Sequence, residues 1–157
     1  MKVLIIASSS DSFFNFRYEL IKRIYSKSHK IVLMAPFIEQ DTKLQKKFFN
    51  MKGISFENFN FERTSMNLFL DFIGLLLAFF KIKSLKPDIV LTYTIKPVIY
   101  GTIISKLIGI NKIFALITGL GYIFISKGKR SPTRMIVERL YKVALSHCEK
   151  IFFQNID

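Results

Sequence analysis

Short apolar segments that alternate with helix-like segments are the feature that most constrains the fold of this chain. The first segment, Val3–Ala7, contains only apolar residues and is followed by a run of serines. Continuous apolar runs of this length are typical of strands buried on both faces of a parallel sheet. Similar segments predict further strands over Lys30–Ala35, Ile54–Phe59, Asp88–Tyr93, Lys112–Thr118 and Lys150–Phe153.

Apolar residues at helical spacing separate these predicted strands. We predict helices over Phe13–Tyr25, Asp41–Met51, Asn67–Ser84, Val98–Ile108 and Thr133–His147. Regular alternation of strands and helices implies right-handed crossovers and a doubly wound parallel sheet. A chain of 157 residues has the length of one domain. The predicted class is therefore α/β, with a single Rossmann-like domain over residues 1–157.

The segment Leu68–Phe80 is apolar apart from Asp71 and allows two interpretations. A membrane-spanning helix needs about 20 mostly apolar residues, and this segment has 13. The favoured interpretation is a buried crossover helix. The alternative is a helix that lies in the membrane interface, with Lys81, Lys83 and Lys86 at its edge.

The chain is strongly basic, with a formal net charge of +13 at pH 7. Such a surface attracts polyanions, including anionic lipids and phosphorylated substrates. A compositional bias toward Lys, Ile, Phe and Asn is the alternative explanation. Nucleic acid is not expected as a partner, because strands with aromatic residues interleaved with Lys and Arg are missing. The only cysteine, Cys148, has no partner for an internal disulfide, which favours a reducing compartment.

Ligands of open parallel sheets bind beyond the carboxyl ends of the strands. Here those ends offer the hydroxyls of Ser8–Ser12, the cations Arg63 and Lys96, and the glycines of Thr118–Tyr122. The set suits a ligand that bears phosphate or sugar groups. It contains no cluster of metal ligands and no paired carboxylates, so no metal is expected. No Gly-x-Gly-x-x-Gly follows the first strand, which argues against a dinucleotide cofactor.

Each of these features also has a purely structural explanation. The serines could cap the following helix through Asp11 or Ser12. Lys96 precedes Pro97 at a helix start, where the helix dipole disfavours a lone cation. A bound anion would relieve that interaction; the alternative is that the Lys96 side chain simply points outward. Downstream, Lys127, Lys129, Arg130 and Arg134 form a basic run that suits lipid phosphates or a solvated loop.

Several motifs resemble those of the bacterial family 4 glycosyltransferases, which have the two-domain GT-B fold. The segments that carry the resemblance are Ser8–Arg17, Leu91–Gly101, Ile117–Phe124 and Phe152–Asp157, with a weaker match around Arg63, Ser65 and Asn67. They occur in the family's order along the whole chain, and the four together are specific. The first loop departs from the family pattern in having serines where many relatives have glycines.

The resemblance implies the acceptor-side, N-terminal half of such an enzyme, without the C-terminal domain that binds the donor. Family members transfer a sugar from a nucleotide sugar to a polyprenyl-diphosphate-linked glycan in surface polysaccharide synthesis. Transfer is usually with retention, needs no metal ion, and takes place at the inner face of the cytoplasmic membrane. The expected partners are thus a lipid-linked acceptor, an anionic membrane surface, and a donor-binding domain or subunit that brings the nucleotide sugar.

The resemblance and the strand ends together define the expected site. The residues expected to line the acceptor cleft are Ser9, Ser10, Asp11, Arg17, Arg63, Lys96, Thr118, Gly119, Gly121 and Tyr122, with Lys127, Lys129, Arg130 and Arg134 on membrane or phosphate. No catalytic residue is assigned, so activity of this chain alone stays open. The alternative is a non-catalytic basic module, or a remnant, that docks on lipid-linked glycan or on a partner protein.

Overall fold

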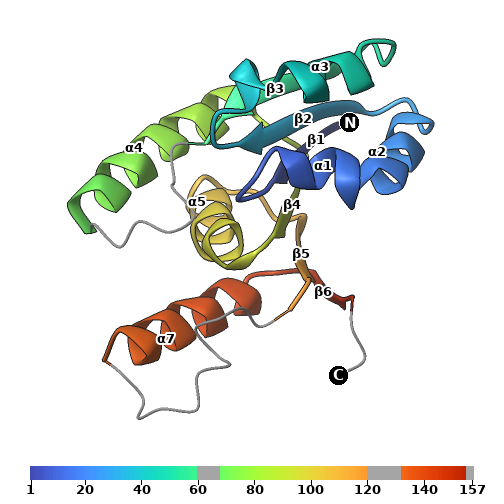
Figure 1. Ribbon diagram of the computed structural model, residues 1–157. Helices are drawn as coiled ribbons and strands as arrows, with labels where there is room; N and C mark the ends of the chain where they lie inside the picture. The colour runs from blue at the N-terminus through green and yellow to red at the C-terminus, as the bar shows by residue number, and fades with distance from the viewer. Residues whose placement is uncertain (60–67, 120–131, 155–157) are drawn as a thin grey trace.

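A computed structural model describes residues 1–59, 68–119 and 132–154 of the chain. Figure 1 shows a central twisted sheet with helices packed on both of its faces. Six parallel strands form the sheet in the order β3-β2-β1-β4-β5-β6. The expected doubly wound α/β class is confirmed. The strands are β1 (Lys2–Ile6), β2 (Lys30–Ala35), β3 (Ile54–Asn58), β4 (Ile89–Tyr93), β5 (Ile113–Ile117) and β6 (Lys150–Phe153).

The direction of winding reverses between β1 and β4. Val3 to Ile6 of β1 pair with Ile31 to Met34 of β2 on one side and with Ile89 to Thr92 of β4 on the other. From β1 the chain moves outward to β2 and β3, returns across the sheet to β4, and then moves outward to β5 and β6. Right-handed crossovers therefore place the helices of the two halves on opposite faces.

The helices divide accordingly between the two faces. One face carries α1 (Asp11–Asn15), α2 (Tyr18–Tyr25) and α3 (Thr42–Phe48), and the other carries α4 (Leu68–Leu85), α5 (Thr102–Leu107) and α7 (Pro132–Ser146). A short 3-10 turn, η1 (Ile38–Gln40), precedes α3, and a π-helical turn, η2 (Pro97–Gly101), leads into α5.

Alternating residues of the strands feed the two cores. Val3 and Ile5 of β1 pack with Phe13 and Ile21 beneath α1 and α2. The neighbouring Leu4 and Ile6 face α4 and α5 on the other side. Burial of both faces explains why the strand sequences are continuously apolar.

Gly101 allows α5 to lie close to the sheet. A Cβ atom at this position would lie 2.9 Å from Ile6 Cδ1 and 3.0 Å from Thr92 Cγ2. Both distances are shorter than normal carbon contacts. Only glycine fits here without displacing its neighbours.

The predicted helix over Phe13–Tyr25 is wrong as a single element, because it divides at Phe16 and Arg17. Arg17 leaves helical geometry with φ −124° and ψ 3°. Phe16 is 71% exposed, so it gains no burial that would stabilise one continuous helix. The break instead lets the Arg17 side chain reach the edge of the sheet.

The apolar crossover helix lies where it was predicted, as α4, but it is not buried on all sides as the prediction implied. Gly74, Ala78 and Ile82 of α4 are buried. Ile73, Leu76, Leu77 and Phe80 form a second stripe whose exposed fractions run from 40% to 64%. The helix is therefore buried on one side only. Among the described residues, no helix combines the length and apolarity needed to cross a membrane.

Candidate functional site

The candidate site lies along the carboxyl ends of the strands, where β1 and β4 meet at the reversal of winding. The segments after β1, β2, β4, β5 and β6 all reach this edge. Open α/β sheets bind ligands at such a switch point because the two neighbouring connections diverge to opposite faces. The side chains described below connect these segments to one another.

The first loop is held by its own serines. Ser12 Oγ donates a hydrogen bond to the Ser9 carbonyl at 2.6 Å and lies 2.8 Å from Tyr93 Oη. Because a hydroxyl has a single proton, the Tyr93 hydroxyl donates to Ser12 in this arrangement. Ser10 Oγ donates to Asp41 Oδ2 at 2.6 Å, which connects the loop after β1 to the start of α3.

The structural alternative for the serine run, capping of the first helix by Asp11 or Ser12, is wrong. Ser10 occupies the N-cap position of α1 and makes no side-chain capping bond, because its hydroxyl is bonded to Asp41. Asp11 lies in the first turn and is exposed. With only five residues, α1 is a short turn that places Phe13 in the core.

Asp41 joins the site although sequence reasoning did not select it. Its carboxylate caps α3 by accepting a hydrogen bond from Leu44 N at 3.0 Å, in addition to the bond from Ser10. Burial alone would raise the Asp41 pKa, but the Ser10 and backbone hydrogen bonds outweigh it and hold the pKa below its usual value. Asp41 thus stays ionised and orients the serine loop.

Tyr93 is the buried centre of the edge. Its side chain is 2% exposed, and its ring meets Phe13 edge-on with 6.0 Å between ring centroids. Burial raises the pKa of the Tyr93 hydroxyl, so the group stays neutral and acts as a hydrogen-bond donor. It offers no base near neutral pH.

Arg17 lies over this tyrosine. The guanidinium carbon is 5.2 Å from the centroid of the Tyr93 ring, a cation–π arrangement. Nη1 donates to the Phe16 carbonyl at 3.0 Å, and Nη2 donates to Gln154 Oε1 at 2.6 Å. Gln154 directly follows β6, so Arg17 connects the first helix pair to the far side of the sheet.

Thr94 and Gly119 have left-handed backbones at the same edge. Thr94, which follows β4, has φ +69°, and Gly119, near the end of β5, has φ +148°. Left-handed geometry suits glycine but is strained for a β-branched residue. The buried Thr94 Oγ1 also has no hydrogen-bond partner in the described part of the chain. Strain combined with an unsatisfied hydroxyl is typical of functional sites.

Lys96 and Thr118 are half-buried and lie at the carboxyl ends of β4 and β5. The sequence predicted a helix from Val98, with Pro97 at its start. In the structure, helical geometry begins earlier, at Ile95, and continues into η2 and α5. Val98 N donates to the Thr94 carbonyl at 3.0 Å, so the first turn is already closed there. Pro97 is tolerated because a residue in the first turn needs no amide proton.

Several predicted site residues lie outside the described ranges or away from the edge. Arg63, Gly121, Tyr122, Lys127, Lys129 and Arg130 belong to the segments that the structure does not describe. Arg134, expected on membrane or phosphate, forms an ion pair with Glu138 one turn later on α7, with Nε and Oε1 2.8 Å apart.

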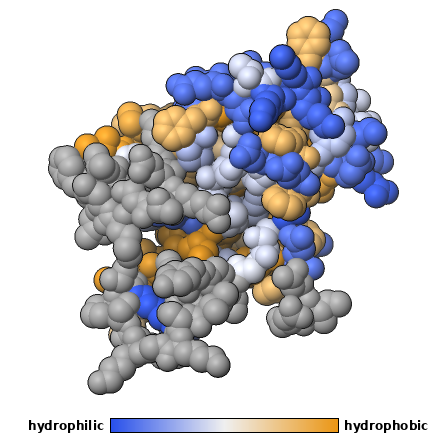
Figure 2. Space-filling view, viewed as in Figure 1, coloured by the Kyte–Doolittle hydropathy of each residue, from blue (hydrophilic) through white to orange (hydrophobic). Residues whose placement is uncertain are grey.

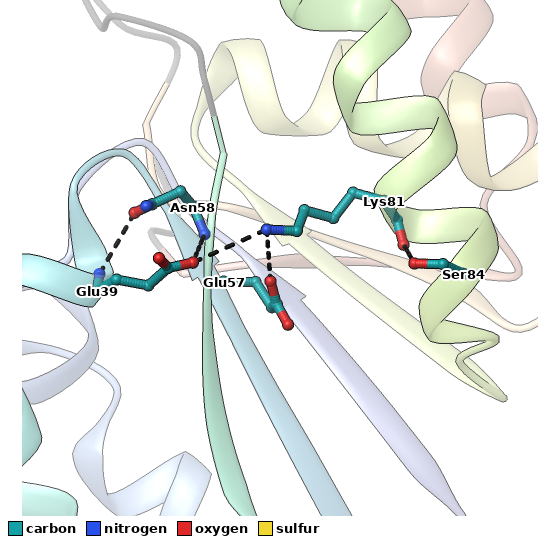
Figure 3. Close-up of polar contacts among 5 residues, drawn as sticks. All are labelled: Glu39, Glu57, Asn58, Lys81 and Ser84. Atoms are coloured by element: carbon teal, nitrogen blue, oxygen red, sulfur yellow. Dashed lines mark hydrogen bonds and ion pairs between the residues drawn. The ribbon is translucent and has the colours of Figure 1, made fainter.

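A second polar network secures the β3 end of the same edge (Figure 3). Glu39 N donates to Asn58 Oδ1 at 3.3 Å, and Asn58 N donates to Glu39 Oε1 at 3.1 Å. Lys81 of α4 lies 2.6 Å from Glu57 Oε2 and 3.8 Å from Glu39 Oε1. The network joins the turn after β2, the end of β3 and α4, and we interpret it as structural support.

The site that results is a hydrogen-bonding and cationic surface. Its groups are serine hydroxyls, a neutral tyrosine, an amide and a guanidinium, which suit oxygen-rich anionic ligands. In the described residues, no three His, Cys, Asp or Glu side chains converge as metal ligands would. Sequence reasoning missed Asp41, Tyr93 and Gln154. Position along the chain is the signal that could have identified them, because Tyr93 ends a predicted strand, Gln154 directly follows one, and Asp41 begins a predicted helix.

Comparison with known proteins agrees with this architecture. An N-acetylgalactosaminyltransferase of Campylobacter jejuni, named for the acceptor N,N'-diacetylbacillosaminyl-diphospho-undecaprenol, is 26% identical over 156 residues. The match covers 99% of this chain and 40% of the relative, so the chain spans about two fifths of that protein's length.

Two solved structures show the same fold at low sequence identity. MurG of Acinetobacter baumannii superposes with a TM-score of 0.63 and 13% identity, covering 98% of this chain and 41% of MurG. The UDP-GlcNAc 2-epimerase of Methanocaldococcus jannaschii superposes with a TM-score of 0.55 and 16% identity, covering 99% of this chain and 40% of the epimerase. The family model for glycosyl transferase 4-like proteins matches residues 2–155. The chain therefore belongs to the glycosyl transferase 4-like family.

Proposed function

We propose that this chain is the acceptor-side half of a glycosyltransferase that moves a sugar from a nucleotide sugar to a polyprenyl-diphosphate-linked glycan. The observation that carries the proposal is the match over 99% of the chain to an enzyme named for a diphospho-undecaprenol-linked acceptor. The edge around Ser10, Arg17 and Tyr93 supports it, because hydroxyls and a guanidinium suit sugar and phosphate oxygens. Lys96, Thr118 and Gly119 extend that surface toward β5.

In this proposal the nucleotide sugar is bound by a separate donor-binding domain or subunit. The acceptor lies between the two, against the carboxyl edge of the sheet. The residues proposed to line that side are Ser9, Ser10, Asp11, Arg17, Arg63, Lys96, Thr118, Gly119, Gly121 and Tyr122. No catalytic residue is assigned on this side.

The test is reconstitution of sugar transfer. This chain is fused to the remaining part of the Campylobacter jejuni relative and supplied with nucleotide-activated N-acetylgalactosamine and its lipid-linked acceptor. The expected result is a glycosylated lipid with the fusion and none with either half alone. If the fusion folds, binds acceptor and transfers nothing, the chain is a non-catalytic binding module. If it folds and binds no acceptor either, the proposal fails altogether.

We further propose that the chain docks peripherally on an anionic membrane at its cytoplasmic face. The exposed apolar stripe of α4 supports this, and α7 adds a second stripe at Ile136, Leu140 and Val143. Both helices pack on the same face of the sheet. Figure 2 shows apolar surface along α4, whereas the side of α2 and α3 is mostly hydrophilic. The net charge of +13 favours anionic lipid.

Flotation with vesicles tests this docking. Replacing Leu77 and Phe80 of α4 by serine should reduce binding to vesicles that contain phosphatidylglycerol. The matched control is Phe49→Ser, because Phe49 is 83% exposed but follows α3 on the opposite face. Equal binding of all variants would show that the α4 stripe does not contact lipid.

A further inference from the structure

The guanidinium of Arg17 is half-buried, and its partners among the described residues are all neutral. They are the Tyr93 ring, the Phe16 carbonyl and the Gln154 side-chain amide. Within residues 1–59, 68–119 and 132–154, the ion pairs involve Lys81 and Arg134, and none involves Arg17. Partly buried arginines ordinarily pair with a carboxylate or a phosphate. This arginine therefore has a binding capacity that the described part of the protein leaves unused.

The unused capacity is confined to one edge of the guanidinium. Arg17 Nε is buried and has no hydrogen-bond partner in the described part of the chain. Nε and Nη2 lie on the same edge of the planar group, which is the edge that binds two oxygens of one anion at once. Nη2 is bonded to Gln154, while Nη1 on the opposite corner is bonded to the Phe16 carbonyl. The one hydrogen bond that the described residues make to this edge comes to the neutral amide of Gln154.

The remaining contacts hold the guanidinium in place for such binding. Its face lies on Tyr93, whose ring is buried against Phe13 and whose hydroxyl contacts Ser12. The Phe16 carbonyl fixes Nη1. Because these contacts do not involve the Nε and Nη2 edge, they can persist when an anion replaces Gln154. A preorganised arginine loses little conformational entropy on binding.

We propose that Arg17 is an anion-binding residue of this edge, which exchanges the Gln154 amide for two oxygens of a phosphate or diphosphate group. Tyr93 is a positioning residue, and Gln154 is the neutral acceptor that the anion displaces. Assignment of that group to the diphosphate of a lipid-linked acceptor rests on the proposed function above. Binding of an inorganic anion at Arg17 does not, so the two ideas can fail separately.

The test is titration of the full chain with inorganic pyrophosphate, followed through the ¹⁵N–¹H resonance of the Arg17 side-chain Nε. An unpaired Nε–H that gains an oxygen acceptor should shift downfield in a saturable manner. Arg17→Gln should weaken pyrophosphate binding about tenfold or more, because a charge-assisted bidentate contact is lost. Arg17→Lys should bind at an intermediate level, since an ammonium keeps the charge without the fork.

Two further variants separate this role from general electrostatics. Arg23→Gln removes the same charge from an exposed position of α2 and should leave binding within about twofold. Gln154→Ala removes the competing amide and should tighten binding. The proposal is overturned if the Arg17 Nε resonance does not respond to pyrophosphate, or if folded Arg17→Gln and Arg23→Gln bind equally. Pyrophosphate binding at Arg17 without binding of lipid-linked acceptor would uphold this site and refute the proposed substrate.

Discussion

The left-handed backbone at Thr94 predicts an unusual order of stability for two simple variants. At φ +69°, the Cβ atom of an L-residue costs about 1–2 kcal/mol. Glycine avoids that cost but loses about 0.4–1 kcal/mol through the greater freedom of the unfolded chain. Thr94→Gly should therefore be more stable than Thr94→Ala by about 0.5–1 kcal/mol. Both variants remove the hydroxyl and the methyl group, so those contributions cancel in the comparison.

The assay is urea unfolding of both variants, with the free energy of unfolding taken from matched slopes. The control is the same pair at Lys22, an exposed position inside α2. There alanine should be the more stable by about 1 kcal/mol, because the backbone is helical. An alanine variant more stable than the glycine variant at both positions would refute the strained geometry of Thr94.

Three further predictions concern the framework of the site. Gly101→Ala should lower the free energy of unfolding by about 1–3 kcal/mol through overpacking. Ile6→Val should relieve part of this loss, since it removes the Cδ1 atom 2.9 Å from the new Cβ. If calorimetry shows that the effects of the two substitutions simply add in the double variant, the contact is contradicted. Asp41→Ala should cost about 1 kcal/mol at pH 7 by removing the cap of α3. The folded-state pKa of Asp41 is lowered, so its contribution to stability is present above the unfolded pKa and is lost as pH falls through the folded value. The stability difference between the wild type and Asp41→Ala should therefore shrink below about pH 4. A constant difference across that range would argue against an ionised cap. Lys81→Met should cost at most about 1 kcal/mol and less in high salt, because Lys81 and Glu57 are both partly exposed; a larger, salt-independent loss in urea titrations would show that more than a screened ion pair is removed.

Local sequence patterns predicted the elements of this fold well. Each predicted strand agrees with an observed strand to within one residue at either end, and β2 and β6 agree at both ends. This succeeds because a strand buried on both faces must be apolar throughout, so the pattern is complete within five or six residues. The prediction of a site at the carboxyl edge followed from the same alternation, since it depends on strand direction alone.

Side-chain patterns were less reliable wherever a distant contact decides the outcome. The helix predicted through Phe16 and Arg17 is broken, and the break lets Arg17 reach Gln154, which lies 137 residues away in sequence. The interior and exterior of α4 were indistinguishable from sequence, because the helix is apolar on nearly all sides and only its packing against β1 and β4 buries Ala78 and Ile82.

The sequence by itself determined the class of the protein, the positions of its strands and the polar character of the edge where they end. Tertiary structure alone decided which of those polar groups meet. Ser10 joins Asp41, Ser12 joins Tyr93, and Arg17 joins Gln154, each across a gap that no local periodicity spans. The physical reason is that secondary structure depends on neighbouring residues. A binding site depends instead on strand order, which is set by how the whole sheet buries its two faces.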